Sequence, residues 1–206
     1  MQEGEEAEGA QELETEEAGA EEVIAEAEVE EKPAKKLQIW FEDEGRFGLH
    51  GRLGRLWSEV GVRPDIQRQT EYEWTWAYGA VCPETGQSAA LLLSRCDGQS
   101  FDYFLRELSN QVGPDAHAIV VLDNAKWHHE HRFEPFDNLT PLHLPPYSPQ
   151  LNPVERLWQH LKRLVLDNTV FDSIEHLEDR FCEVWQTLTP ESLRSLCHAS
   201  WCDDIL

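Results

Sequence analysis

The chain lacks a long apolar run, a closely spaced cysteine pair and, in its first 31 positions, any Lys or Arg. A membrane-spanning helix needs about 18 or more consecutive apolar residues, so no transmembrane segment is expected. The N-terminus also has no basic region followed by an apolar one, which argues against a secretory signal. These absences predict a cytoplasmic protein.

The cysteines are five, an odd number, and none forms a CxxC pair. Cys197 and His198, together with Cys202, could be read as part of a zinc site, but the usual ligand spacings are missing. Buried, reduced thiols are therefore the expectation.

The first 31 residues contain fourteen Glu and no aromatic side chain. Such a segment cannot bury enough apolar surface to offset the entropy lost on ordering. We therefore predict a disordered acidic tail over residues 1–34. Residues 35–206 then form one domain, which is long enough to bury a sizeable core.

Charge is unevenly distributed over the rest of the chain. Residues 33–206 carry 26 acidic and 16 basic side chains, a net charge of −10. This balance disfavours non-specific binding of nucleic acid, because contacts to phosphates need Lys and Arg. Residues 45–68 reverse it, with five Arg against two acidic residues. The global and the local charge thus point in different directions.

Apolar patterns predict a mixed α/β layout, with helices at 100–111, after Asn152 and after Ser173. Strands are expected at 37–41, 47–52, 72–81, 88–93, 118–122 and 142–144. The uninterrupted apolar run 118–122 is typical of a central strand buried on both faces. The order is an antiparallel meander, a helix, a buried strand, a short strand and further helices. It resembles that of ribonuclease-H-like folds, in which helices flank a mixed sheet.

The stretch 145–155 combines a proline-stiffened turn with the start of a helix. Asn152 suits the N-cap, Pro153 the first helical position and Glu155 the third. On one interpretation Glu155 completes a capping box with Asn152. On the other, the rigid turn directs Glu155 toward a metal ion.

Two further acidic residues follow predicted strands. Asp43 comes after 37–41 and Asp123 after 118–122, and ligands in open α/β sheets gather at the carboxyl ends of strands. Three carboxylates brought together repel one another unless cations hold them, and oxygen ligands select Mg²⁺ or Mn²⁺. Pattern alone leaves Glu42 and Glu44 open as alternatives to Asp43. A carboxylate at a strand end is also commonly a solvated turn residue.

Four segments, in order, resemble motifs of mariner-superfamily DDE transposases, in particular their bacterial insertion-sequence branch. They are WFEDEGRFGL (40–49), WSEVGVRP (57–64), VLDNAKWH (121–128) and PPYSPQLNPVE (145–155). The resemblance implies a ribonuclease-H-like catalytic domain in which Asp43, Asp123 and Glu155 hold two Mg²⁺ or Mn²⁺ ions. It further implies metal-dependent DNA strand cleavage and strand transfer at transposon ends.

The resemblance also implies partners. These are DNA, as transposon ends and as target, and a homodimer. Full transposases of this kind carry N-terminal helix-turn-helix modules, whereas this chain begins with an acidic segment. The chain therefore looks like a catalytic half, with DNA recognition supplied by a separate N-terminal module or chain.

Several other side chains are candidates for supporting roles. Asn124 and His128 are candidates for supporting the metal ligands, His128 through a hydrogen bond. A histidine metal site at His128, His129 and His131 is disfavoured, because neighbouring residues of one element point apart. The candidate DNA contacts, whose basic members could equally be solvated surface residues, are Arg46, Trp57, Arg63, Arg156, Lys162 and Arg163.

Two alternatives to a transposase stay open. One is a catalytically idle remnant, or a DNA-associated partner-binding protein, that keeps the fold. The other is a ribonuclease-H-like nuclease acting on another nucleic acid, against which the 57–64 and 145–155 segments argue.

Overall fold

The computed structural model describes residues 35–55, 57–62, 65, 69–129, 136–146 and 148–198. The predicted acidic tail and the candidate DNA contact Arg63 lie outside these residues, so both stay predictions. No helix of the described part is long and apolar enough to cross a membrane.

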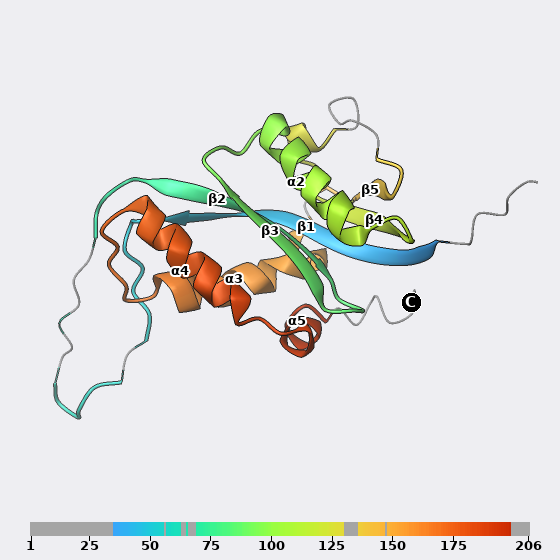
Figure 1. Ribbon diagram of the computed structural model, residues 1–206. Helices are drawn as coiled ribbons and strands as arrows, with labels where there is room; N and C mark the ends of the chain where they lie inside the picture. Colours follow the sequence, from blue (N-terminus) through green and yellow to red (C-terminus); the bar gives the residue numbers. More distant parts are fainter. Residues whose placement is uncertain are drawn as a thin grey trace, which may run out of the picture. The chain divides into compact units, whose positions relative to one another are not determined.

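A five-stranded mixed sheet in the order β3-β2-β1-β4-β5 forms the centre of the domain (Figure 1). Neighbouring strands β1, β2 and β3 are antiparallel, whereas β4 runs parallel to both β1 and β5. The mixed sheet predicted from the sequence is therefore confirmed. The strands are β1 (Lys36–Gly48), β2 (Trp74–Cys82), β3 (Gln87–Leu93), β4 (Ala116–Leu122) and β5 (Leu139–His143).

The first strand differs from the prediction, because β1 is one strand of 13 residues and not a hairpin of 37–41 with 47–52. Acidic residues are rare in strands, which is why a break was predicted at the three acids after Phe41. Two of these acids have hydrogen-bond donors: Trp158 donates to Asp43 and Trp127 to Glu44. Polar groups with partners can be buried, so the strand continues through them. Asp43 thus lies inside β1, not at its end.

Helices cover both faces of the sheet (Figure 1). One face carries α2 (Gly98–Val112), and the other carries α3 (Val154–Leu166), α4 (Ile174–Gln186) and α5 (Pro190–Leu196). The helix predicted after Ser173 is α4, and the Ser173 side chain caps it by accepting a hydrogen bond from the His176 amide. Two short 3₁₀ turns, η1 (Lys126–His128) and η3 (Pro149–Leu151), precede β5 and α3 respectively.

Each face of the sheet has its own hydrophobic core, and β1 contributes to both. Trp40 packs in the core under α2, and the adjacent Phe41 packs in the core under α3 and α4. Successive side chains of a strand point to opposite faces, so even-numbered positions of β1 face α2 and odd-numbered positions face α3. This alternation decides where each acid of β1 points.

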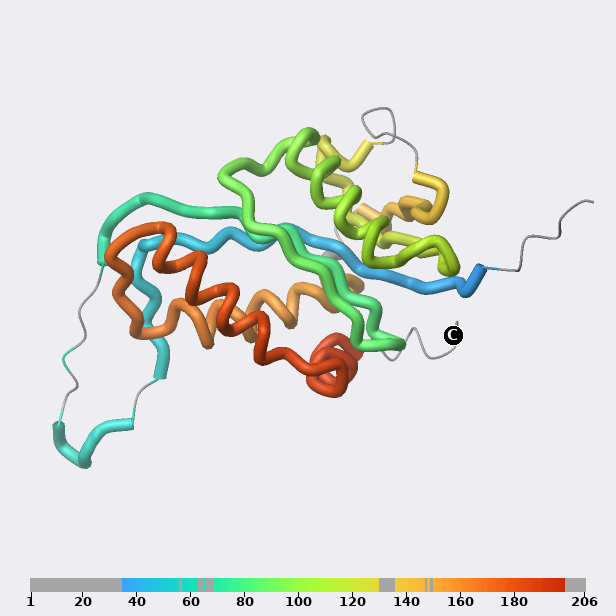
Figure 2. The backbone as a smooth tube through the Cα atoms, in the orientation of Figure 1, coloured from blue at the N-terminus to red at the C-terminus, as the bar shows by residue number. Residues whose placement is uncertain are grey.

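The described parts of the segment between β1 and β2 extend away from the sheet (Figure 2). Trp57 on this segment is fully exposed. Near β1 the segment is held to the end of α3, where Arg52 and Asp167 form an ion pair of 3.0 Å and a β-bridge.

Candidate metal and catalytic site

A cavity of about 340 Å³ lies where β1, the carboxyl end of β4 and the start of α3 meet. The three carboxylates singled out from the sequence, Asp43, Asp123 and Glu155, all line it. The other lining residues are Asn124, Ala125, Leu144, Pro145, Ser148 and Asn152. Side chains 80 and 32 positions apart in the sequence thus share one cavity.

The pairing of β1 with β4 explains why the first two carboxylates meet. The strands are parallel, and Phe41 lies opposite Val121. Two positions further along each chain stand Asp43 and Asp123, both in phase with those apolar residues. The pairing ends at Phe41 and Val121, and just beyond it both carboxylates line the same cavity.

Asp43 is held from below by the indole of Trp158. The indole N–H donates to Asp43 Oδ2 at 3.1 Å. The indole ring packs so closely on two glycines that neither position has room for a side chain. A Cβ on Gly79 would lie 2.5 Å from Trp158 Cη2, and one on Gly45 would lie 2.9 Å from Cδ2. Burial and the negative charge of Glu155 raise the pKa of Asp43 from 3.8 to about 7.

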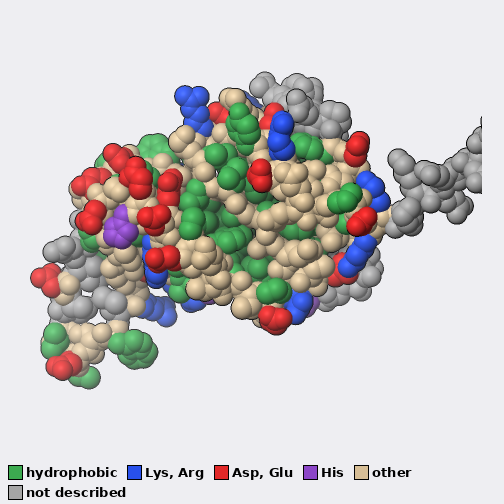
Figure 3. Space-filling model, in the orientation of Figure 1, with side chains coloured by type: hydrophobic (Ala, Val, Ile, Leu, Met, Phe, Trp, Pro, Cys, Tyr) green, Lys and Arg blue, Asp and Glu red, His purple; other side chains and the backbone are tan. Residues whose placement is uncertain are grey.

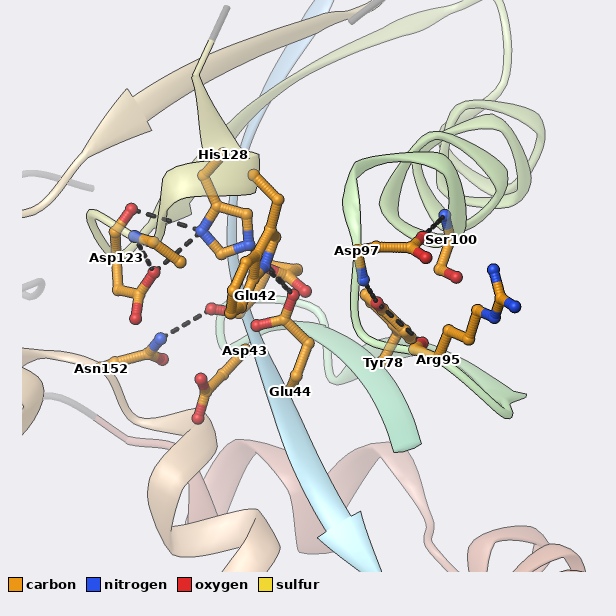
Figure 4. A network of polar contacts seen from close by, with 12 residues as sticks. Glu42, Asp43, Glu44, Tyr78, Arg95, Asp97, Ser100, Asp123, His128 and Asn152 are labelled. Atoms are coloured by element: carbon orange, nitrogen blue, oxygen red, sulfur yellow. Dashed lines mark hydrogen bonds and ion pairs between the residues drawn. The ribbon is translucent and has the colours of Figure 1, made fainter. Parts of the chain in front are cut away.

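The start of α3 is tied to β1 by Asn152 (Figure 4). Its Nδ2 donates to the Glu42 carbonyl at 2.7 Å, and its Oδ1 accepts from the Val154 amide at 3.1 Å. The cap position belongs to Pro153, one residue later than predicted, and its side chain makes no capping hydrogen bond. Glu155 lies in the first turn and lines the cavity. The helix is therefore positioned by a contact to the strand that carries Asp43.

Asp123 is oriented by the imidazole of His128. His128 Nδ1 lies 2.8 Å from Asp123 Oδ1, which also accepts from the Ala125 amide at 2.8 Å. The hydrogen bond from His128 lowers the pKa of Asp123. Burial opposes a charge on His128, but hydrogen bonds to Asp123 and Glu44 outweigh it and raise the pKa of His128 to about 10. Asn124 donates to the Leu144 carbonyl at 2.6 Å and lines the cavity.

Glu42 and Glu44, the alternatives to Asp43, point to the other face of β1 and do not line the cavity (Figure 4). Glu44 Oε1 lies 3.1 Å from His128 Nε2 and accepts from Trp127 Nε1 at 2.8 Å. Glu42 is fully buried, 3.9 Å from the same His128 nitrogen, and neither of its carboxylate oxygens has a hydrogen-bond partner. Burial and the charge of Glu44 raise the pKa of Glu42 well above its usual range.

The chemistry of the cavity fits a hard divalent cation. Its described lining holds three carboxylates, two asparagines and a serine, and none of its residues is basic. Burial first, and then the charge of Glu155, raise the pKa of Asp43 to about 7, so a bound cation would favour its ionised form. Oxygen donors at such a cluster are the ligands that Mg²⁺ and Mn²⁺ prefer. The roles of these three residues stay predictions at this point.

The candidate DNA contacts fall into two groups. Arg46 and Trp57 belong to β1 and the segment after it; Arg46 is exposed and lies over the Trp74 ring at 5.4 Å. Lys162 is half-buried, with its amino group 5.8 Å from the centre of the Phe47 ring. Burial lowers the pKa of Lys162, although Glu155 and Asp43 act in the opposite direction.

Arg156 and Arg163 line a second cavity, of about 500 Å³, on the surface of α3. Arg52 lines it as well, opposite Asp167, its ion-pair partner. Sequence reasoning did not single out Arg52, although the basic balance of residues 45–68 pointed to its segment.

Sequence reasoning also missed the roles of Trp158 and Asn152. No role in the site was predicted for Trp158, and Asn152 was assigned only to the cap of the helix. A signal was present, because Trp158 stands three positions after Glu155 and therefore shares its side of the helix. The acceptor of its N–H, Asp43, lies on a distant strand that the helix pattern does not reveal.

Comparisons with known proteins identify a family and a fold. The model of the family described as DDE superfamily endonuclease matches residues 38–178. An uncharacterized protein, y4pE/y4sA of Sinorhizobium fredii, is 36% identical over 130 residues, which are 62% of this chain and 96% of that protein. The transposable element Tc3 transposase of Caenorhabditis elegans is 31% identical over 170 residues, covering 77% of this chain and 52% of that protein.

An uncharacterized 39 kDa protein of insertion element IS630 from Shigella sonnei is 23% identical over 156 residues, 74% of this chain and 46% of that protein. The chain thus spans about half the length of the Tc3 and IS630 proteins.

Solved structures show the same fold. The Mos1 strand transfer complex matches with a TM-score of 0.60 at 18% identity, covering 78% of this chain and 50% of that chain. The Mos1 mariner paired end complex with Mn matches with a TM-score of 0.62 at 17% identity, covering 78% and 52%. The predicted ribonuclease-H-like fold class is thereby confirmed.

Proposed function

The chain belongs to the DDE superfamily endonucleases, and we propose that residues 35–206 are the catalytic domain of a transposase. Its reaction is metal-dependent cleavage of DNA at transposon ends, followed by strand transfer to a target. The observation that carries this proposal is the cavity lined by Asp43, Asp123 and Glu155. We also propose a cytoplasmic location.

We propose that these three carboxylates bind Mg²⁺ or Mn²⁺, two ions per site. Mos1 complexes are known with Mn and with Mg, and the donor set here is the type that both metals accept. Bound divalent ions would activate a water or a 3′-hydroxyl as nucleophile and stabilise the leaving oxygen. Side chains of this chain set the geometry in which that happens.

Each residue contributes through its surroundings. Asp43 is fixed by the Trp158 indole, and burial followed by the charge of Glu155 raises its pKa to about 7, so the carboxyl would lose its proton when a cation binds. Asp123 accepts two hydrogen bonds through Oδ1, which directs Oδ2 to the cavity. Glu155 approaches from the first turn of α3, a helix anchored to β1 by Asn152. The three carboxylates thus come from β1, from the residue that follows β4 and from the first turn of α3.

Charge on the surface indicates how DNA would approach. Acidic side chains gather over α4 on the face shown in Figure 3, and that face would repel phosphates. Arg156, Lys162 and Arg163 project from α3, and the two arginines share their cavity with Arg52. We therefore propose that the DNA backbone follows α3 from the carboxylates toward this basic cavity. Arg46 and Trp57 would contact DNA beyond β1.

Partners follow from the relatives. The matched Tc3 and IS630 proteins are about twice as long as the aligned part, and Mos1 is known in paired end complexes. We propose that recognition of transposon ends needs a separate N-terminal helix-turn-helix module or chain, and that the catalytic domain works as a homodimer.

The test is cleavage of a labelled duplex carrying the inverted repeats that border the gene. We expect nicking that depends on Mg²⁺ or Mn²⁺ and stops with EDTA, if necessary with a DNA-binding module supplied in trans. Asp123→Asn should abolish nicking, whereas Asp179→Asn, the same change on the exposed face of α4, should leave it intact. Metal-dependent nicking by Asp123→Asn at the parental rate would refute the proposal.

An idle remnant of the fold remains the competing function, and the acidic face of α4 is the observation in its favour. The two differ in metal binding as well as in cleavage. A protein that binds no Mn²⁺ and cuts no DNA under any of these conditions would be such a remnant.

A further inference from the structure

Behind the carboxylate cavity, on the α2 face of the sheet, lies a second group of polar side chains that the reaction does not itself require. It consists of Glu42, Glu44, Trp127 and His128, and we call it the rear cluster. His128 and Glu44 are almost wholly buried, with side chains 1% and 6% exposed. Burying charged groups is costly unless they are paired, so the cluster calls for an explanation.

The contacts of the rear cluster form a chain that ends at the cavity. Trp127 Nε1 donates to Glu44 Oε1 at 2.8 Å, and the same oxygen lies 3.1 Å from His128 Nε2. On its other side, His128 Nδ1 lies 2.8 Å from Asp123 Oδ1 (Figure 4). The Phe101 ring packs against the imidazole with its centroid 4.4 Å away. The imidazole is therefore fixed by packing and by a contact at each nitrogen.

Asp123 needs such support more than Asp43, which lies within β1 and accepts a hydrogen bond from the Trp158 indole. Its side chain is 55% exposed, and it follows the last residue of β4, outside the sheet's hydrogen bonding. His128 Nδ1 and the Ala125 amide both contact Oδ1. The rotamer of Asp123 is thus set from one side, which leaves Oδ2 directed to the cavity.

We propose that Glu44 and His128 are positioning residues, which act through the imidazole to hold the Asp123 carboxylate in the orientation that binds the metal. Trp127 fixes Glu44 in turn. The inference rests on the proposed metal-dependent function, because it assigns these residues a role toward the same ion.

A different role for the rear cluster is a metal site of its own. Glu42, Glu44 and His128 offer ligand atoms within 4.8 Å of one another, and Glu42 has two buried oxygens without a partner. Both nitrogens of His128 already face carboxylates, however, and a metal at Nε2 would break the contact to Glu44. Positioning accounts for more of the observed contacts, and the experiment below separates the two roles.

The experiment measures the binding of Mn²⁺ to the purified full chain without DNA. Binding is detected by calorimetry or from the EPR signal of free Mn²⁺. For His128→Gln we expect affinity to fall about 10–100-fold, the usual effect of removing a group that orients a metal ligand. Glu44→Gln keeps the shape of the side chain and an acceptor for Trp127 and His128, so its Mn²⁺ affinity should fall less. The Mn²⁺ affinity of Glu44→Ala should fall nearly as far as that of His128→Gln. The number of ions bound per chain should stay the same in all three variants.

Asn138→Ala is the matched control. Asn138 is buried under α2 and makes three hydrogen bonds, to Ser109 and Gly113, remote from the cavity. It should lower the melting temperature without changing Mn²⁺ affinity, which distinguishes positioning from a merely structural role. If His128→Gln does not fold, the graded pair Glu44→Gln and Glu44→Ala carries the test.

The outcomes separate this inference from the proposed function. Parental Mn²⁺ affinity in folded His128→Gln and Glu44→Ala would overturn the positioning role and leave the metal centre standing. Loss of one bound ion per chain in Glu42→Gln, with the other ions bound normally, would overturn it in favour of a separate metal site. Absence of Mn²⁺ binding by the parent protein, with Asp123→Asn as reference, would overturn both.

Discussion

Replacing Asp43 by asparagine should stabilise the metal-free protein, and the gain should depend on pH. The pKa of Asp43 is raised from 3.8 to about 7 by burial and by the charge of Glu155. The folded state holds this proton more tightly than the unfolded state does. The protein is therefore most stable at a pH where the Asp43 carboxyl is protonated in both states. As pH rises from about 4, the unfolded chain ionises first and stability falls, until the folded carboxyl also ionises near pH 7.

The size of the effect follows from that difference in pKa. Each pH unit between the two values corresponds to 1.36 kcal/mol, so a shift from 3.8 to about 7 costs the folded protein about 4 kcal/mol above pH 8. Asparagine resembles the protonated form and can still accept the hydrogen bond from Trp158. Asp43→Asn should therefore raise the free energy of unfolding by up to about 4 kcal/mol at pH 8 and hardly at all at pH 4.

The assay is urea unfolding of parent and variant in EDTA at pH 4, 6 and 8, with the free energy extrapolated to water. Asp179→Asn on the exposed face of α4 removes the same charge and should show no comparable pH-dependent gain. An equal effect of Asp43→Asn at pH 4 and pH 8, or a loss of stability at pH 8, would refute the reasoning. The expected result would mean that the carboxylate which binds the cation makes the metal-free protein less stable.

Three further results are expected. At limiting Mg²⁺, the rate of DNA cleavage should rise with pH up to about 7 and then level off, because Asp43 must lose its proton to bind the ion; a flat profile from pH 5.5 to 8.5 would contradict this. Gly79→Ala places a Cβ 2.5 Å from Trp158 Cη2. It should lower the free energy of unfolding in urea by about 1–3 kcal/mol and reduce the rate of DNA cleavage. An unchanged free energy and an unchanged rate would show that the indole position is unimportant. Arg163→Ala should reduce the slope of log affinity for DNA against log salt by about one, whereas Arg180→Ala on α4 should not; equal slopes in parent and Arg163→Ala would remove Arg163 from the DNA path.

The choice among the three acids of β1 shows how far a pattern can reach. Asp43 is in phase with Ile39 and Phe41, so strand alternation predicts it on their face, but the pattern leaves Glu42 and Glu44 open as alternative ligands. The structure agrees, since Glu42 and Glu44 face the other layer. The length of the strand was predicted wrongly: the acids were expected to end it after Phe41, because acidic residues are rare in strands, whereas β1 continues to Gly48. The donors that stabilise them come from residues 83 and 115 positions away, and no local pattern reveals such partners.

The central strand gives a complementary case. The apolar run 118–122 was enough to predict a buried strand ending just before Asp123, and β4 is that strand, begun two residues earlier at Ala116. Its register against β1, which brings Asp123 beside Asp43, depends on parallel pairing between segments separated by two strands and a helix. The orientation of Asp123 depends further on His128, whose role was predicted only as a hydrogen bond. Sequence thus indicated the residues of the site, while their arrangement follows from tertiary contacts.

The alternation along β1 has a consequence for how this strand can change. Glu42, Asp43 and Glu44 are consecutive, yet the middle one serves the cavity and its neighbours serve the opposite layer. Inserting or deleting one residue earlier in the strand would move every side chain to the other face. A glutamate would then enter the cavity and the aspartate would face His128, so that both layers would still hold carboxylates but of the wrong length. Point substitutions within β1 can therefore affect one layer at a time, whereas a single-residue insertion or deletion would disrupt both at once.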